Sequence, residues 1–151
     1  VGETLKVMVS AGCRPLACMI WCSGARKMGL RDRHIGNPEE RIRNLNQIAY
    51  NTRYLILPWV RVPHLASHLL GRFARDLPGQ WMERYGHTVV YLETYVQPDR
   101  YPGTCYKAAN WISLGLTSGR GVKAKTSKAT VARKELLVYP LSKAFQKKLK
   151  V

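Results

Sequence analysis

Acidic residues are scarce in this sequence. Its 151 residues include 9 Asp and Glu against 25 Lys and Arg, which gives a formal net charge of +16 and a pI near 10.1. The excess is concentrated at one end, where residues 119–151 hold ten basic residues and one acid. A charge of this size favours polyanions, because cations that contact phosphates release counterions. We therefore expect contact with nucleic acid; the alternative is a basic surface that only aids solubility.

Metal-binding and disulfide patterns are also missing. No CxxC pair occurs among the four cysteines, which are Cys13, Cys18, Cys22 and Cys105, so we expect reduced thiols and no structural zinc site. His64 and His68 are four residues apart, but there is no HExxH motif and no evident third ligand. We therefore predict no metal site.

Long apolar runs and a signal peptide are absent as well. No apolar run approaches 18 residues, so we expect no membrane span and a cytoplasmic location. The chain begins with Val rather than Met and opens almost directly on a strand pattern, which is consistent with a fragment of a longer protein.

What is present predicts one folded domain of the α+β or mixed α/β class. Hydrophobic residues make up 46% of the chain, enough for a core. Alternation and apolar runs predict strands over 5–11, 16–22, 54–57, 88–96, 111–116 and 134–141, of which the first two should pair as an antiparallel hairpin. Glycines predict a loop over 23–37. Helical patterns predict helices over 38–51, from 63 to about 77 and over 104–110, a short turn over 80–86, and a basic terminal segment over 142–151.

The central stretch, residues 54–70, reads YLILPWVRVPHLASHLL. It predicts a buried strand, a short turn and a helix, with Pro63 at the first helical position and a break at Pro78 and Gly79. A turn before a helix presents free N–H groups and a positive dipole end. The turn is therefore a candidate anion site; the alternatives are that it holds a cofactor phosphate, a nucleic-acid phosphate, or no ligand.

Two motifs around this stretch resemble the GNAT N-acyltransferase fold. Residues 61–70, RVPHLASHLL, match the spacing of its pyrophosphate motif R-G-x-G-I-G-x-x-L-L, and Asp99-x-x-Pro102-x-x-Cys105-Tyr106 matches its N-x-x-A-x-x-F-Y helix. The resemblance implies a GNAT-like domain with a central mixed sheet that lacks the fold's first strand and first two helices. It also implies an acetyl-CoA or other acyl-CoA site formed by Arg61, Val62, Pro63, His64, Ala66, Ser67 and His68. Val62, His64 and Ala66 stand where the motif has glycines. The loss of these glycines would weaken the binding of a pyrophosphate.

Two residues are candidates for catalysis. Glu93 is the only acid in an apolar strand, so it could act as a general base; the alternative is an ion pair with an arginine such as Arg61. Tyr106 occupies the position of the general-acid tyrosine that the GNAT resemblance implies, and otherwise it packs its ring in the core. Cys105 is either a nucleophile or an inert buried thiol.

A second resemblance covers most of the chain. Residues 31–36 (RDRHIG), 51–70, 93–121 and 134–141 (KELLVYPL) are similar to a bacterial family that includes the DruA protein of Druantia anti-phage systems and often lies beside transposase domains. It implies a mobile-element or phage-defence setting. Partner proteins of such a system are then possible. From length and charge we expect one domain over residues 1–151, with a basic loop at 118–133 and a basic segment at 142–151.

Six residues are candidates for nucleic-acid contact: Arg31, Arg33, Arg120, Lys123, Lys125 and Lys128. Arg31-Asp32-Arg33 could instead lock its own loop by an internal salt bridge, and the other four could form a solvated loop. Our first hypothesis is a domain that contacts nucleic acid; the alternatives are an acyl-CoA-dependent N-acyltransferase and an oligomerisation module.

Overall fold

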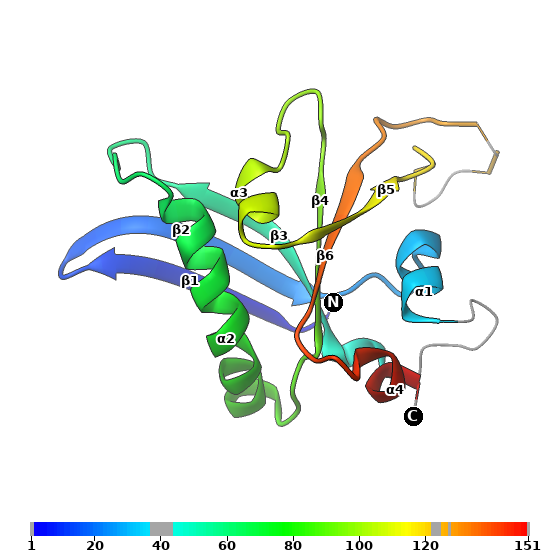
Figure 1. The fold of residues 1–151 in the computed structure, drawn as a ribbon, viewed down its shortest axis with the longest axis horizontal. Coiled ribbons are helices and arrows are strands. Elements are labelled where there is room, and N and C mark those ends of the chain that lie inside the picture. Colours follow the sequence, from blue (N-terminus) through cyan, green and yellow to red (C-terminus); the bar gives the residue numbers. More distant parts are fainter. Residues whose placement is uncertain (1, 37–43, 122–124, 127, 151) are drawn as a thin grey trace.

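A mixed β-sheet forms the centre of the protein. The computed structural model describes residues 2–36, 44–121, 125–126 and 128–150. These residues form a six-stranded sheet in the order β1-β2-β3-β4-β6-β5 (Figure 1). The strands are β1 (Thr4–Ala11), β2 (Arg14–Ser23), β3 (Ile48–Ile56), β4 (Tyr91–Val96), β5 (Ile112–Leu116) and β6 (Glu135–Pro140). Neighbours pair antiparallel except β3 and β4, which are parallel.

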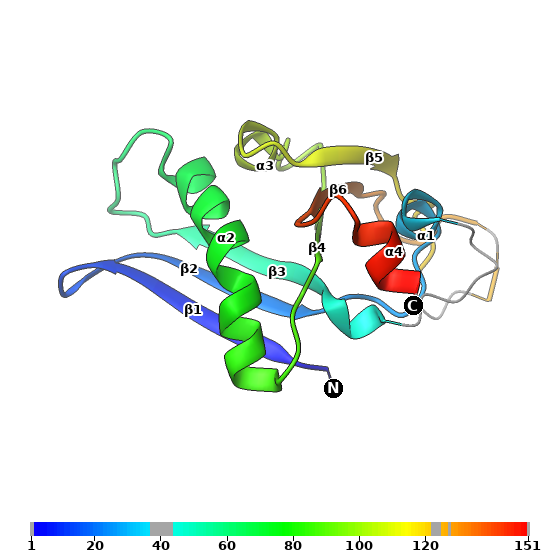
Figure 2. The same ribbon diagram turned by 60° about the horizontal axis from the view of Figure 1, so that its bottom comes forward.

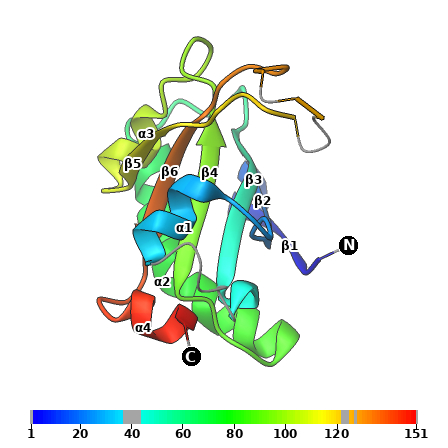
Figure 3. The ribbon, with the colours of Figure 1, turned by 90° about the vertical axis from the view of Figure 1, so that its right-hand side faces the viewer.

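Helices cover both faces of the sheet because its strands bury apolar side chains on both sides. The long helix α2 (Leu65–Tyr85) crosses β1–β3 on one face (Figure 2), where Trp21, Leu77 and Trp81 are fully buried. The short helix α3 (Thr104–Ala108) packs its Tyr106 into this same core. On the opposite face α1 (Gly29–Ile35) and α4 (Phe145–Lys150) enclose a second core near β4 and β6 (Figure 3).

The parallel pair separates soon after it begins. Ile48–Tyr50 of β3 pair with Tyr91–Glu93 of β4. Beyond that point β3 pairs only with β2, and β4 only with β6, so the two strands diverge toward α2 and α3 (Figure 1). We call the space between them the wedge. It lies at the carboxyl ends of the two strands, a usual place for ligands in open sheets that contain parallel strands.

The predicted α+β class, the N-terminal hairpin and the strand–turn–helix order are confirmed. The predicted helix over 38–51 is wrong for residues 44–51. Residues 37–43 lie outside the described residues. Leu45–Gln47 form one 3₁₀ turn, η1, and Ile48 already begins β3. Burial explains the error, because Ile48 and Ala49 are fully buried on opposite faces of the sheet.

Helix boundaries near proline were also predicted wrongly. Pro63 does not begin the helix, because α2 starts at Leu65. Pro78 does not end it either: α2 continues to Tyr85 and includes the segment predicted as a separate turn. Since Leu77 and Trp81 are both fully buried, packing on either side of Pro78 offsets the hydrogen bond that proline cannot donate. A further helix, α1, lies within residues 23–37, where a loop was predicted.

Candidate functional site

The seven residues predicted to hold acyl-CoA lie in the turn after β3 and in the first turn of α2. None of them is buried. His64 has a φ of 57°, in the left-handed region that glycine favours, so the backbone keeps a glycine-like shape although glycine is absent. Ser67 donates its hydroxyl to the His64 carbonyl (3.1 Å). Arg61 donates to the carbonyls of Pro58 and Val60 within its own turn.

Side chains of the protein occupy the wedge itself. Asn51 is 2% exposed, and its amide donates to the carbonyls of Ile20 (3.2 Å) and Arg53 (3.1 Å). Its carbonyl oxygen accepts the Tyr106 hydroxyl, while the Tyr54 hydroxyl donates to the Ala66 carbonyl (2.8 Å). These polar groups therefore satisfy one another where a cofactor would have to enter.

Tyr106, the predicted general acid, sits in this closed network. It is 7% exposed, and its ring meets those of Tyr54 and Trp111 edge-on. Burial raises the pKa of both Tyr54 and Tyr106, so each hydroxyl keeps its proton at neutral pH. A donor role toward a substrate would require Tyr106 to leave Asn51.

Glu93 lies on the other face of the sheet. Within β4, Leu92 and Val96 face α2, whereas Tyr91, Glu93 and Tyr95 face α1. Glu93 and Tyr106 are therefore separated by the sheet. The structure does not bring the two predicted catalytic residues together.

Glu93 instead forms a buried ion pair with Arg31 of α1. Both side chains are fully buried, and one guanidinium nitrogen lies 3.2 Å from each carboxylate oxygen. Arg31 also donates to Asp32 (2.9 and 3.0 Å). Burial raises the pKa of Glu93, and the charge of Arg31 opposes that rise. An ion pair was one prediction for Glu93, but the partner is Arg31 rather than Arg61.

Arg31 consequently cannot contact nucleic acid in this conformation, because it is fully buried. The alternative prediction, an internal salt bridge within Arg31-Asp32-Arg33, describes it correctly. Arg33, the residue that follows Asp32, is exposed. Because this segment was predicted as a loop, the sequence analysis did not separate the buried face of α1, which holds Arg31, from the exposed face, which holds Arg33.

Two candidates remain, Cys105 as a nucleophile and the histidine pair His64 and His68 as metal ligands. Cys105 is half-buried, and burial raises the pKa of its thiol, which makes it a poor nucleophile. Within residues 2–36, 44–121, 125–126 and 128–150, no three His, Cys, Asp or Glu side chains gather closely enough to hold a metal ion. The described helices also include none with the length and apolar character of a membrane span.

A basic side is formed by segments that are far apart in the sequence. Figure 3 shows α1, α4 and the described parts of the 117–134 connection (117–121, 125–126 and 128–134) on the side of the molecule that faces the viewer. Side-chain bonds join α4 to α1 and to Asn44: Gln146 of α4 donates to the His34 carbonyl (3.0 Å), and Asn44 donates to the Lys148 carbonyl (2.9 Å). The exposed cations of the three segments and of the residues that precede α1 and α4 are Arg26, Lys27, Arg33, Arg120, Lys125, Lys128, Arg133, Lys134, Lys143, Lys147, Lys148 and Lys150. We call this set the basic side.

Two acids of the described chain, Asp32 and Glu135, bind residues that do not belong to the basic side. Asp32 is bound to Arg31, and Glu135 lies 3.1 Å from Lys107. Of the predicted nucleic-acid contacts, Arg33, Arg120, Lys125 and Lys128 belong to the basic side, while Lys123 lies outside the described residues. Sequence reasoning missed Arg26, Lys27 and the meeting of α1 with α4, although the basic composition of 142–151 was a signal.

Comparison with solved structures gives the fold. The chain is similar to the spermidine N-acetyltransferase of Vibrio cholerae solved with CoA and spermine (TM-score 0.59, 9% identity, 93% of this chain and 67% of that one). It is also similar to the aminoglycoside acetyltransferase AAC(6')-Ib solved with coenzyme A and kanamycin (TM-score 0.56, 10% identity, 98% and 72%). A third is the microcin C7 self-immunity acetyltransferase MccE, of which the chain spans 61% (TM-score 0.53, 6% identity, 91% of this chain).

Comparison of sequences gives the family. No curated protein matches the chain at a significant level. The family model described as Druantia protein DruA matches residues 4–127, which include the buried Arg31–Glu93 pair, the wedge and α2. The chain therefore belongs to the DruA family, and its fold is that of the GNAT acetyltransferases.

Proposed function

We propose that this domain contacts nucleic acid through its basic side, as part of a mobile-element or anti-phage defence system. The observation that carries the proposal is that α1, α4 and the described parts of the 117–134 connection lie on one side and carry exposed cations. Asp32 and Glu135 bind residues outside this set of cations. Cations arranged in this way exchange condensed counterions for phosphate contacts, which gives affinity without base specificity.

The test is a charge-matched pair of variants. Arg26→Ala/Lys27→Ala/Arg33→Ala removes three charges from the basic side. Arg72→Ala/Arg75→Ala/Arg84→Ala removes three from α2, on the other side of the sheet, where all three are exposed. Fluorescence anisotropy with a labelled oligonucleotide is measured from low to moderate salt.

The basic-side variant should bind more weakly and lose about two to three units of the slope of log K against log salt, whereas the α2 variant should resemble wild type. Equal losses in both variants would mean that net charge alone drives binding. Wild-type binding that does not change with salt would contradict the electrostatic basis of the proposal.

Acyl-CoA binding is the second candidate function. The diverging parallel strands and the left-handed residue before α2 favour it, and two of the similar acetyltransferases were solved with CoA. The network of Asn51, Tyr54 and Tyr106 in the wedge opposes it. CoA at millimolar concentration should raise the melting temperature if it binds, through mass action on the folded state. The absence of any shift would remove this candidate.

A further inference from the structure

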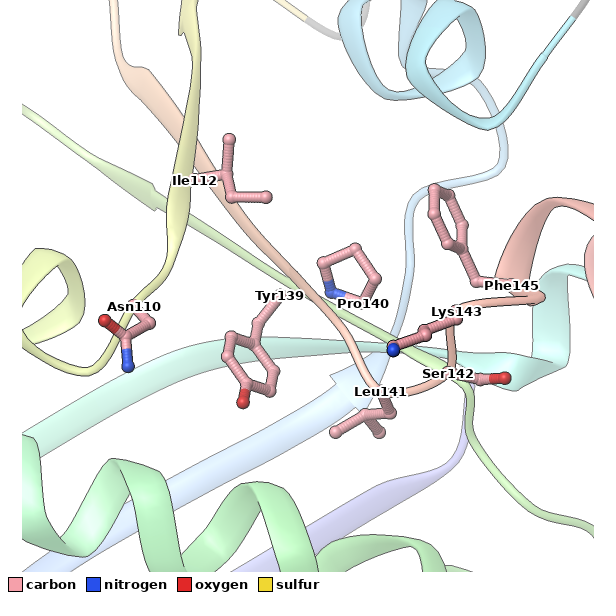
Figure 4. A pocket seen from close by; sticks show the side chains of 8 residues that line it. All are labelled: Asn110, Ile112, Tyr139, Pro140, Leu141, Ser142, Lys143 and Phe145. Carbon is pink, nitrogen blue, oxygen red and sulfur yellow. The ribbon is translucent and has the colours of Figure 1, made fainter.

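A pocket lies where β6 extends beyond the last residue that pairs with its neighbour β5. The last antiparallel pair joins Ile112 to Val138, and Asn110, with a left-handed φ of 66°, turns the chain away from the sheet. Among the described residues, no strand therefore pairs with the end of β6 on that side. The pocket has a volume of about 320 Å³ (Figure 4), and Asn110, Ile112, Tyr139, Pro140, Leu141, Ser142, Lys143 and Phe145 line it.

Two aromatic side chains give this pocket rigid, flat walls. The Tyr139 ring lies 6.0 Å from that of Trp111, a buried residue of the α2 core. The Phe145 ring lies 5.4 Å from that of Tyr91 and belongs to the other core. Because each ring is held by a core, the pocket is formed before any ligand arrives, which lowers the entropy cost of binding.

Three polar groups at the pocket have no hydrogen-bond or ionic partner in the described part of the chain. They are the Asn110 carboxamide, the Tyr139 hydroxyl and the Lys143 ammonium group. The carboxamide both donates and accepts, the hydroxyl does the same, and the ammonium group supplies a positive charge. A few unpaired polar groups around a mainly apolar surface are typical of a small-ligand site.

We propose that this pocket takes one unpaired nucleotide of a single strand that runs along the basic side. The base would stack on the aromatic wall, its edge would bond to Asn110, and the adjacent phosphate would meet Lys143. This inference rests on the proposed function, because Lys143 begins the segment that leads to Lys147 and Lys148 of the basic side. Stacking of bases on aromatic rings beside a cationic path is a common way to bind single strands.

The experiment compares strands of equal charge. A labelled 12-mer of thymidine and the same backbone with abasic sites are titrated into the full chain, with oligouridine as the RNA arm. Wild type should bind the strand with bases about tenfold more tightly than the abasic strand. Preference for oligouridine would identify the source of the nucleotide as RNA, and preference for oligothymidine would identify it as DNA.

Two tryptophan substitutions on β5 form the matched pair. Ile112→Trp fills the pocket, whereas Leu116→Trp alters the same strand outside it; the two residues are 48% and 51% exposed. The first should abolish the preference for bases and the second should keep it. Asn110→Gly retains the left-handed backbone and should weaken the preference for the strand with bases over the abasic strand. This variant tests the pocket if Ile112→Trp fails to fold.

The outcomes separate this inference from the proposed function. Equal affinity for the abasic strand and the strand with bases would overturn the pocket while leaving electrostatic binding in place. If neither strand binds at low salt, the proposed function fails. Thymidine monophosphate, followed by NMR at the Asn110 side-chain amide, then decides the pocket: saturable shifts retain it, and unchanged signals at millimolar concentration overturn it.

Discussion

Removing the charge of Arg31 should lower the free energy of unfolding more than the removal of a surface charge does. Arg31→Met keeps most of the side-chain length but leaves the Glu93 carboxylate fully buried without a counter-charge. Loss of one partner of a buried pair costs about 3–5 kcal/mol, because the remaining charge stays desolvated. Since a domain of this kind has roughly 5–15 kcal/mol of stability, the variant should fold at low temperature with a clearly reduced midpoint.

The assay is urea denaturation followed by tryptophan fluorescence, with two comparison variants. Arg72→Met breaks the exposed pair with Asp76, which is 3.6 Å long, and should cost less than about 0.5 kcal/mol. Arg31→Met/Glu93→Leu removes both buried charges and should return to within about 1 kcal/mol of wild type.

Two results would refute this reasoning. The first is a loss below about 1 kcal/mol in Arg31→Met, which would mean that water or another group compensates Glu93. The second is a double variant that is no more stable than the single variant, which would mean that packing of the arginine stem dominates over its charge. Recovery in the double variant would also favour a structural role for Glu93 over general-base catalysis.

Three further predictions concern the rest of the fold. His87 lies 2.7 Å from Glu3. Burial lowers the pKa of His87, but its bonds to Glu3 and to the Thr88 carbonyl, together with the charge of Glu3, outweigh burial and raise that pKa; the pair should therefore stabilise the fold fully below about pH 6.5 and lose this effect as pH rises through the folded-state pKa. Denaturation of wild type and His87→Gln across pH 5.5 to 8.5 should show that loss, below about 1 kcal/mol, in wild type alone; parallel profiles would disprove it. Tyr106→Phe should cost about 1–2 kcal/mol in urea denaturation, because the buried Asn51 carbonyl loses its donor, and an unchanged midpoint would argue against this bond. Gly103→Ala should lower the melting temperature, at a cost of about 1–3 kcal/mol, since φ is 72° and the new Cβ would stand 2.9 Å from a methyl group of β6; equal melting temperatures would count against it.

Local patterns were sufficient for much of the fold. Partial alternation in β1, the apolar run of β2 and the largely apolar sequence of β4 predicted three strands, and the helical pattern over 104–110 predicted α3. Where tertiary packing outweighed local preference, prediction failed. Pro78 is a helix breaker in isolation, yet α2 passes through it because residues on either side are buried.

The candidate sites depended even more on long-range contacts. The RDRHIG motif was one of the segments that carry the family resemblance, but its sequence does not show which of its two arginines is buried. Only the docking of α1 on β4 assigns Arg31 to Glu93, 62 residues away, and leaves Arg33 exposed. Likewise, the spacing of the acyl-CoA motif is preserved, but Asn51, Tyr54 and Tyr106 meet in the wedge through contacts that no local pattern contains.

The sequence by itself determined the strong positive charge, the α+β class, the strand–turn–helix at the centre and the family. Each follows from composition or from short-range spacing, which a single chain displays directly. The tertiary structure alone decided that the two catalytic candidates lie on opposite faces, that one arginine is a buried counter-ion, and that α1 and α4 share a basic side. Burial and pairing are properties of elements brought together by folding, so they cannot be read from either element alone.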